Sequence, residues 1–268
     1  GSSDQHQLQA MATKAAQHLE AGEFEKARSL AEETLKRCRE SLGLKHATTL
    51  SAMHTLALTA QQTGQLDEAI LVLEQVAALS PAVLGSDHRN TSIIKNNLAL
   101  AYQQNSQLKK AASLREPLLA KAVAEARENQ PPEIVSNVLA GQATNLLVLE
   151  KFAQAEPVAR ECLEIRQREI PDKWPVFHAK CLIGAAVAGQ AKQMLEKDPT
   201  NAEVNFVIAE SLLLEGYNGL EERKDLLPDP SGDNFRQTIQ RIIDMYTDWE
   251  KPEEVSSWKE KLVNLNDE

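Results

Sequence analysis

Aromatic residues are scarce in this chain of 268 residues: they make up 4% of it, although 42% of the residues are hydrophobic. Long apolar runs are also missing. The longest, from Cys181 to Gly189, falls well short of the ~18 apolar residues that indicate a membrane-spanning helix. The three cysteines are odd in number and form no CxxC motif, which argues against a disulfide framework and a structural zinc site. We therefore expect a cytoplasmic protein that does not cross a membrane.

An excess of basic residues is missing too. Residues 1–130 contain 14 basic and 14 acidic residues, whereas residues 131–268 contain 15 basic and 25 acidic ones, so the net charge of −10 belongs to the second part. Proteins that bind nucleic acids or anionic membrane surfaces present basic patches. The charge distribution therefore disfavours both classes of partner.

Signature motifs of enzymes are absent as well: the chain has no GxSxG, HExxH, GxGxxG or Walker-type phosphate loop. His46 and His88 stand 42 residues apart at equivalent predicted helix starts, which favours a structural capping role over catalysis. Cys162 and Cys181 fall at apolar positions and are interpreted as core residues. We expect no catalytic residue, no metal site and no cofactor, and hence no enzyme.

The chain contains an internal repeat. Four similar segments, each ending in alanine, start 42, 42 and 44 residues apart: Glu23–Ala27, Gln65–Ala69, Gln107–Ala111 and Lys151–Ala155. Glycines also recur every 21 residues, at Gly22, Gly43, Gly64 and Gly85. Since glycine readily adopts the left-handed conformation that ends a helix, this spacing predicts two helices in each repeat.

A small residue also stands 12 residues before each closing alanine, at Ala15, Ala57, Ala99 and Ala143. Between the glycines, the apolar residues follow the three-and-four spacing of a helix rather than the alternation of a strand. Two helices approach closely only where small side chains face each other. The pattern therefore predicts helical hairpins that cross at pairs of alanines.

This combination resembles the tetratricopeptide repeat, although its period of 42 residues exceeds the usual length of about 34. Leu42–Leu50, followed by Leu56-Ala57 and Glu68-Ala69, is similar to the long-helix variety found in kinesin light chains, and Leu84–His88 with Asn97-Leu98-Ala99 repeats it. Similar units also form arrays attached to signalling kinases in some bacteria. The resemblance covers about residues 5–170 and implies an all-α, right-handed solenoid of about six antiparallel helix pairs.

The predicted organisation has four parts along one continuous solenoid. Residues 1–3 are typical of an expression-tag remnant, and residues 4–190 form regular units. Residues 191–208 are expected to be an irregular insertion with a break at 198–201, because a proline there disfavours helix at the preceding residue. Residues 209–268 form the last units and a cap. Nine of the 11 aromatic residues follow residue 150, which fits the extra apolar bulk that an end unit needs.

Two prolines fall inside predicted second helices. Pro117 is expected to kink its helix, because proline removes one backbone hydrogen bond and crowds the preceding turn. Pro157 is expected in the first turn of its helix, where proline is tolerated.

In such a solenoid the first helix of every repeat lines the inner wall. The predicted inward positions, taken around each small alanine on a 3.6-residue turn, are His54, Thr55, Leu58 and Gln61 in the second repeat, Ile93, Asn96, Asn97, Leu100 and Gln103 in the third, and Asn137, Ala140 and Thr144 in the fourth. Asparagine and glutamine each offer a donor and an acceptor, so they can pair with a peptide backbone. The resemblance implies that Asn97 occupies the place of a kinesin light chain groove asparagine.

Some tetratricopeptide adaptors instead clamp the C-terminal carboxylate of a chaperone with cationic groove residues. The corresponding positions here, Ala12, Ala16, Thr55 and Leu100, are uncharged. A carboxylate buried without a cation or strong donors is costly. We expect no such clamp at these positions.

Two hypotheses for function remain. The preferred one is a non-enzymatic interaction module whose concave groove binds an extended peptide segment of a protein partner, with self-association as a further form of contact. The alternative is a structural or engineered repeat scaffold that has no native peptide ligand.

Overall fold

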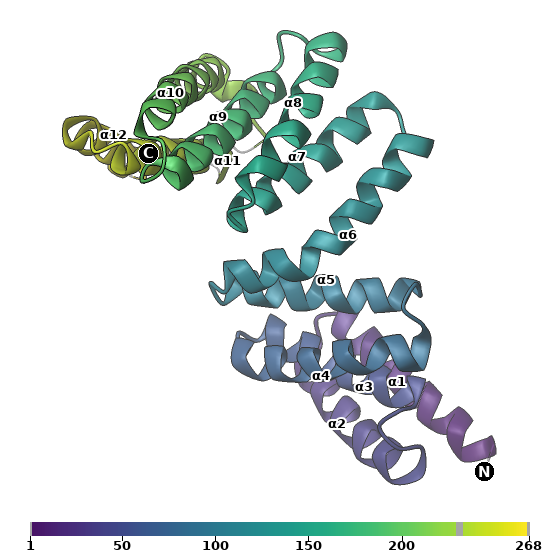
Figure 1. The fold of residues 1–268 in the computed structure, drawn as a ribbon. Coiled ribbons are helices and arrows are strands. Elements are labelled where there is room, and N and C mark those ends of the chain that lie inside the picture. The colour runs from purple at the N-terminus through teal and green to yellow at the C-terminus, as the bar shows by residue number, and fades with distance from the viewer. Residues whose placement is uncertain (1, 229–232, 267–268) are drawn as a thin grey trace. The chain divides into compact units, whose positions relative to one another are not determined.

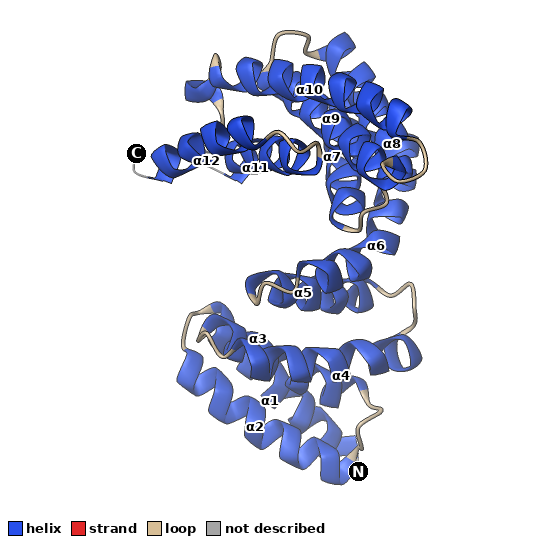
Figure 2. Ribbon diagram, turned by 60° about the vertical axis from the view of Figure 1, so that its left-hand side comes forward, coloured by secondary structure: helices blue, strands red, loops and turns tan. Residues whose placement is uncertain are grey.

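The computed structural model describes residues 2–228 and 233–266, and all its regular elements are helices, with no strand in those ranges (Figures 1 and 2). Six helical hairpins follow one another along the chain. Their α-helices are α1 (Ser2–Glu20) and α2 (Phe24–Ser41), α3 (Ala47–Gln62) and α4 (Leu66–Leu84), α5 (Arg89–Gln104) and α6 (Leu108–Asn129), α7 (Pro132–Val148) and α8 (Phe152–Glu169), α9 (Trp174–Met194) and α10 (Pro199–Glu221), α11 (Asp233–Asp248) and α12 (Pro252–Asn266). The predicted all-α fold of about six helix pairs is confirmed.

The chain divides into two compact units, Gly1–Leu118 and Leu119–Glu268, which we call unit 1 and unit 2. The boundary falls inside α6, which serves both cores. Its first half carries Ala111, which packs with Leu98 in unit 1. Its second half carries Val123, which packs with Leu139 in unit 2. Among the described helices, none combines the length and the apolar character that crossing a membrane requires.

Alanines sit where the helices of a hairpin cross. The four predicted pairs are Ala15 with Ala27, Ala57 with Ala69, Ala99 with Ala111, and Ala143 with Ala155, and each of these side chains is at most 2% exposed. A larger side chain at a crossing would hold the two backbones apart. The alanine spacing in the sequence therefore fixes where each hairpin closes.

The glycines end helices as the sequence predicts. Gly22, Gly43, Gly64 and Gly85 all have positive φ angles, between 73° and 109°. At each helix start that follows Gly43 and Gly85, a histidine ring caps the backbone. His46 Nδ1 accepts from the N–H of Thr48 at 3.2 Å, and His88 Nδ1 accepts from the N–H of Asn90 at 3.1 Å. The predicted capping role of both histidines is confirmed.

The structure contradicts an irregular insertion over residues 191–208, although the helix break expected at 198–201 is present slightly earlier in the chain. Residues 191–194 complete α9, only residues 195–198 form a turn, and α10 starts at Pro199 with the carboxylate of Asp198 as its cap. The extra residues lengthen these two helices instead of forming a loop. Residues 229–232 of the linker that precedes the last hairpin lie outside the described residues.

Glycines replace alanine where α9 crosses α10. A Cβ at Gly184 would stand 2.7 Å from Leu213, and one at Gly216 would stand 2.8 Å from the backbone oxygen of Phe177. These two long helices therefore touch through backbone and small side chains. Within residues 191–208, Ala191, Ala202 and Phe206 are fully buried, whereas Leu195, Val204, Val207 and Ile208 are exposed.

Prolines lie inside three second helices, at Pro81, Pro117 and Pro157. α6 is assigned as one helix across Pro117, and the kink there stays a prediction. The prediction for Pro157 is wrong, because α8 begins at Phe152 and Pro157 is therefore its sixth residue, in the second turn.

A glycine introduced at position 106 should stabilise unit 1. Ser106 stands 42 residues after Gly64 and takes the same left-handed conformation, with a φ of 58°. A side chain in that conformation costs about 1–2 kcal/mol, of which the greater freedom of unfolded glycine cancels a part. We expect Ser106→Gly to raise the free energy of unfolding by about 0.5–1 kcal/mol in urea titrations. The converse change, Gly64→Ala, should lower it, and a destabilised Ser106→Gly would contradict this account.

A methyl group at position 216 should push α10 away from α9. The new Cβ would collide with the sulfur of Cys181 and with the backbone oxygen of Phe177, and a backbone atom cannot rotate aside. We expect Gly216→Ala to lower the free energy of unfolding by about 1–3 kcal/mol. Gly141→Ala in α7 is the matched control, since a Cβ there meets only Leu119 at 3.9 Å. It should be stabilising by about 0.5–1 kcal/mol, because alanine favours helix over glycine.

Candidate functional site

First helices of successive hairpins contact one another within each unit: α1 with α3 and α3 with α5 in unit 1, and α7 with α9 and α9 with α11 in unit 2. α3 and α9 therefore have first-helix neighbours on two sides, whereas α5 has one within unit 1, α3, and each helix keeps an open stripe. On α5 that stripe consists of Ile93, Asn96, Leu100 and Gln103, which we call the α5 stripe. Ile93 and Leu100 are 38% and 42% exposed, so two large apolar side chains of one stripe face solvent.

Two polar pairs tie α3 to α5 beside this stripe. Asn97 Nδ2 lies 2.9 Å from His54 Nε2. Two turns further along both helices, Gln61 Nε2 donates to Gln104 Oε1 at 2.7 Å. Since an amide nitrogen only donates, the His54 ring accepts through an unprotonated Nε2. Asn97, the best sequence candidate for ligand binding, thus bonds a neighbouring helix.

Burial lowers the pKa of His54 to about 4. The ring is therefore neutral near pH 7, which is the state that the bond from Asn97 requires. Protonation of Nε2 would remove the acceptor of that bond.

Three of the predicted groove residues do not line an open face. Thr55, Gln61 and Ala140 are 4%, 8% and 7% exposed, because neighbouring helices cover them. Leu58 and Thr144 are half-buried. The Thr144 hydroxyl donates to the backbone oxygen of Ala140 at 2.9 Å, within the same helix. Its proton is therefore already used in a hydrogen bond inside α7. Of the predicted set, the freely exposed members are those of the α5 stripe and Asn137.

Asn137 on α7 accepts from a residue that sequence reasoning missed. Arg166 Nη2 donates to Asn137 Oδ1 at 3.2 Å, and Arg166 Nη1 donates to the backbone oxygen of Pro175 at 2.8 Å. Arg166 is only 3% exposed although it carries a charge. It escaped notice because it belongs to a second helix, α8, and reaches between the starts of α7 and α9.

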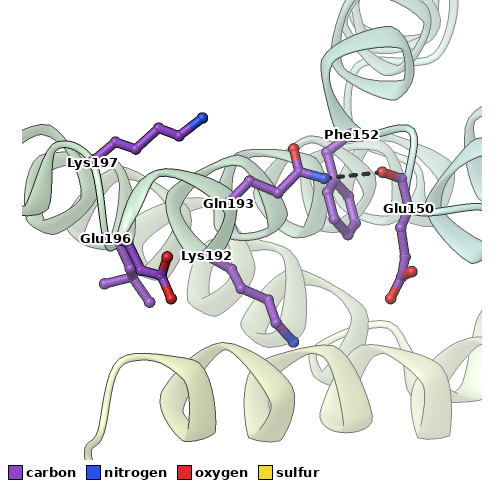
Figure 3. A pocket seen from close by; sticks show the side chains of 7 residues that line it. Glu150, Phe152, Lys192, Gln193, Glu196 and Lys197 are labelled. Carbon is purple, nitrogen blue, oxygen red and sulfur yellow. Dashed lines mark hydrogen bonds between the residues drawn. The ribbon is translucent and has the colours of Figure 1, made fainter.

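A shallow pocket of about 470 Å³ lies in unit 2, where the end of α9 meets the start of α8 (Figure 3). Gln193 Nε2 donates there to the backbone oxygen of Glu150 at 3.3 Å, and the Phe152 ring forms part of the wall. Lys192 on the same wall is bound to Asp248 at 3.0 Å, and this contact raises its pKa. The Gln193–Glu150 contact joins α9 to the residues that precede α8, and the Lys192–Asp248 ion pair joins α9 to α11.

Residues 7–82 match the tetratricopeptide repeat family. They cover α1 from Gln7 onward, all of α2 and α3, and α4 as far as Ala82, and the sequence resemblance is confirmed for these repeats. The tetratricopeptide fold suggests a protein–protein interaction module, and proteins built of such repeats are in general non-enzymatic scaffolds. No curated protein matches the chain.

Several solved structures are similar to the chain at low sequence identity. A Podosopora anserina kinesin light chain protein of nearly identical TPR-like repeats is 20% identical, with a TM-score of 0.48 over 77% of this chain and 94% of that one. BtubC (BKLC) from P. vanneervenii is 18% identical, with a TM-score of 0.44 over 97% and 91% of the two chains. Bacillus thuringiensis PlcR in complex with the peptide PapR7 and DNA is 14% identical, with a TM-score of 0.34 over 84% and 75%.

Unit 1 should lose stability on mild acidification because of His54. The unfolded chain takes up the proton near pH 6.5, whereas folded His54 takes it up only near pH 4. Between these values the unfolded state binds more protons, so the free energy of unfolding falls as the pH falls, by up to about 1.4 kcal/mol per pH unit. His54→Gln, which keeps an acceptor for Asn97, should show a flatter profile in urea titrations between pH 7 and 4. Identical slopes for both proteins would contradict this role of His54.

Proposed function

We propose that this protein is an interaction module whose unit 1 binds an extended peptide segment along the α5 stripe. The observation that supports it most directly is the exposure of Ile93 and Leu100 on a helix whose opposite face is buried. Exposed apolar side chains that are flanked by amides, here Asn96 and Gln103, are typical of sites that hold apolar groups and a peptide backbone together.

The spacing of the stripe indicates the form of the peptide. Ile93 and Leu100 are seven residues apart, which corresponds to about 10 Å along a helix. Three residues of a polyproline II segment span about 9 Å and return the side chain to the same side. A peptide with apolar side chains three residues apart would therefore place one on each of the two anchors.

The side-chain amides on and beside the stripe differ in whether they already have a hydrogen-bond partner within the protein. The Asn96 side chain has no hydrogen-bond partner among the described residues, whereas Gln103 Oε1 accepts from Arg115 Nη1 at 2.8 Å. The side-chain nitrogen of Asn97 is hydrogen-bonded to His54. We therefore assign backbone pairing to Asn96 first, and a supporting role to Asn97, which fixes α5 against α3.

The test is selection of a phage-displayed library of random 12-residue peptides on the full chain, followed by affinity measurements with the enriched peptides. Leu100→Ser should weaken binding roughly tenfold or more, because a buried leucine contact is lost. Asn96→Ala should weaken it several-fold, in keeping with about 0.5–1.5 kcal/mol for one hydrogen bond. Leu71→Ser is the matched control, since Leu71 is 59% exposed but lies on the second helix α4.

Failure to enrich any peptide would favour the alternative, a repeat scaffold without a peptide ligand. Equal losses for Leu100→Ser and Leu71→Ser would place binding elsewhere than on the α5 stripe.

A further inference from the structure

Helix α10 has an apolar face that its neighbouring helices leave open. Val204 and Val207 are each 51% exposed, and Ile208 is 43% exposed. Residues three and four apart share one face of a helix, so these side chains form a continuous surface, which we call the α10 patch. α10 packs against α9 and α11 (Figure 1), and its Phe206 and Leu213 are fully buried. Among the described residues, no other helix exposes three large apolar side chains.

The patch departs from the internal repeat. Val207 and Ile208 stand two residues and one residue before Ala209, which is completely buried like the closing alanines of the other repeats. The equivalent pairs in the first four hairpins are Glu25-Lys26, Asp67-Glu68, Lys109-Lys110 and Ala153-Gln154. Seven of these eight residues are charged or polar, so the packing of a hairpin does not require an apolar side chain at either position.

The patch also extends onto residues that the other hairpins lack. α10 begins at Pro199, ten residues before Ala209, whereas α2 begins three residues before Ala27 and α8 three residues before Ala155. Val204 therefore lies on an added part of the second helix. Apolar side chains that are contiguous and face solvent, unlike single ones, are typical of interaction surfaces.

α10 carries negative charge only, since it contains four glutamates and no basic residue. One of them, Glu215, pairs with Lys180 of α9 at 2.9 Å. Lys192 of α9 is paired as well, with Asp248 at 3.0 Å. Because residues 192–222 contain seven acidic residues and two basic ones, these ion pairs leave an excess of negative charge around the patch.

Two glutamates beside the patch bond neutral groups instead of cations. Trp249 Nε1 donates to Glu203 Oε2 at 2.6 Å, and the Tyr246 hydroxyl donates to Glu210 Oε1 at 2.7 Å. Lys251 lies over the Trp249 ring, 4.8 Å from its centroid, and forms no ion pair with either carboxylate. Each carboxylate thus keeps its charge and a second oxygen that bonds no described residue. Electrostatic complementarity favours a partner with basic side chains.

We propose that the α10 patch binds an amphipathic helix of a protein partner, whose apolar stripe is flanked by lysine or arginine. Val204, Ile208 and Ser211 follow the four- and three-residue spacing of the ridges along which helices pack against one another. Glu203 and Glu210 are seven residues apart and therefore lie on one flank of α10, where basic side chains of the partner reach their open oxygens.

Two other occupants fit the patch less well. A second copy of the chain would bring the same glutamates against those of the first, and like charges repel. An anionic membrane surface would be repelled for the same reason. The patch is also separate from the α5 stripe, which lies in unit 1 and is uncharged.

The probe is an 18-residue helical peptide of leucine, lysine and alanine, with the leucines in one stripe and the lysines on both sides of it. A second peptide has glutamate in place of every lysine, and a third spreads the same residues as the first around the helix. In fluorescence titrations of the full chain at low salt, the first peptide should bind about tenfold more tightly than the other two. Equal affinities for the lysine and glutamate peptides would overturn the proposal.

Ile208→Gln should weaken binding of the lysine peptide about fivefold, because an apolar contact is lost. Ile134→Gln is the matched control, since Ile134 is also an isoleucine of unit 2 that is 43% exposed, but it lies on α7. Both variants change exposed side chains and should keep the melting temperature of the wild type. Equal losses of affinity in the two variants would overturn the proposal.

The charge is tested with the double variant Glu203→Gln/Glu210→Gln, which keeps an acceptor for Trp249 and Tyr246. It should bind the lysine peptide several-fold more weakly than the wild type at low salt, and the difference should disappear at high salt. Glu133→Gln/Glu164→Gln, two exposed glutamates on α7 and α8, is the control and should bind like the wild type. A double variant that keeps full affinity at low salt would contradict the proposal.

A measurement on the wild-type protein does not depend on any variant. In carbon-13 methyl NMR spectra, the δ1-methyl signal of Ile208 should shift with a saturating dependence on the lysine peptide, while that of Ile134 should stay. Shifts of Ile134 alone, or equal shifts of both, would place the peptide elsewhere.

Sedimentation and vesicle binding test the other occupants. A dimer of the free protein that Ile208→Gln dissociates would assign the patch to a second copy and overturn the proposal. Binding to vesicles of phosphatidylserine and phosphatidylcholine that Ile208→Gln abolishes would assign it to a membrane surface and overturn it too. Because the α5 stripe is uncharged, a preference for lysine over glutamate peptides is not expected from binding by unit 1.

Discussion

The close approach of two helix backbones at a pair of small side chains is the constraint on which the rest of this structure depends. Ala57 on α3 and Ala69 on α4 are completely buried, the hairpins α1–α2, α5–α6 and α7–α8 carry equivalent buried alanines, and α9–α10 uses glycines instead. Once the crossing is fixed, the apolar residues one turn away meet and form the core. The open stripe of each first helix follows from the same geometry, because it is the stripe that no neighbouring helix covers.

The sequence predicted the features that depend on local chemistry. Glycine at 21-residue intervals marked helix ends, since a positive φ favours glycine at Gly64 and its equivalents. His46 and His88 were recognised as caps because they recur one repeat apart, and their Nδ1 atoms do accept backbone N–H groups. The repeat pattern predicted the helix boundaries less well where the length of the repeat changes. At residues 191–208 it predicted an irregular insertion, whereas α9 and α10 absorb the extra residues through the close contact at Gly184 and Gly216.

The site was predictable only in part, because a helical wheel describes one helix and burial depends on its neighbours. The wheel placed Thr55 and Gln61 on the inner face, but both are buried among the neighbours of α3, and Gln61 donates to Gln104 of α5. It placed Asn97 there as well, and the structure adds the His54 ring that takes its hydrogen bond. Arg166 could not be found from any wheel of a first helix. Its long side chain starts on α8 and ends beside Asn137, a contact that exists only once the hairpins have packed.

Polar groups between the first helices therefore do two different things in the two units. In unit 1 neutral partners satisfy each other: Gln61 donates to Gln104, and Asn97 pairs with a histidine whose burial keeps it uncharged. These pairs fix α3 against α5 and leave the α5 stripe apolar and neutral. In unit 2 the guanidinium of Arg241 keeps one buried nitrogen without an acceptor. A neutral pair leaves no polar atom unused, whereas a buried guanidinium nitrogen without an acceptor costs stability. The polar groups of unit 1 thus fix one helix against the next at little cost, whereas in unit 2 the described residues leave one buried donor of Arg241 unsatisfied.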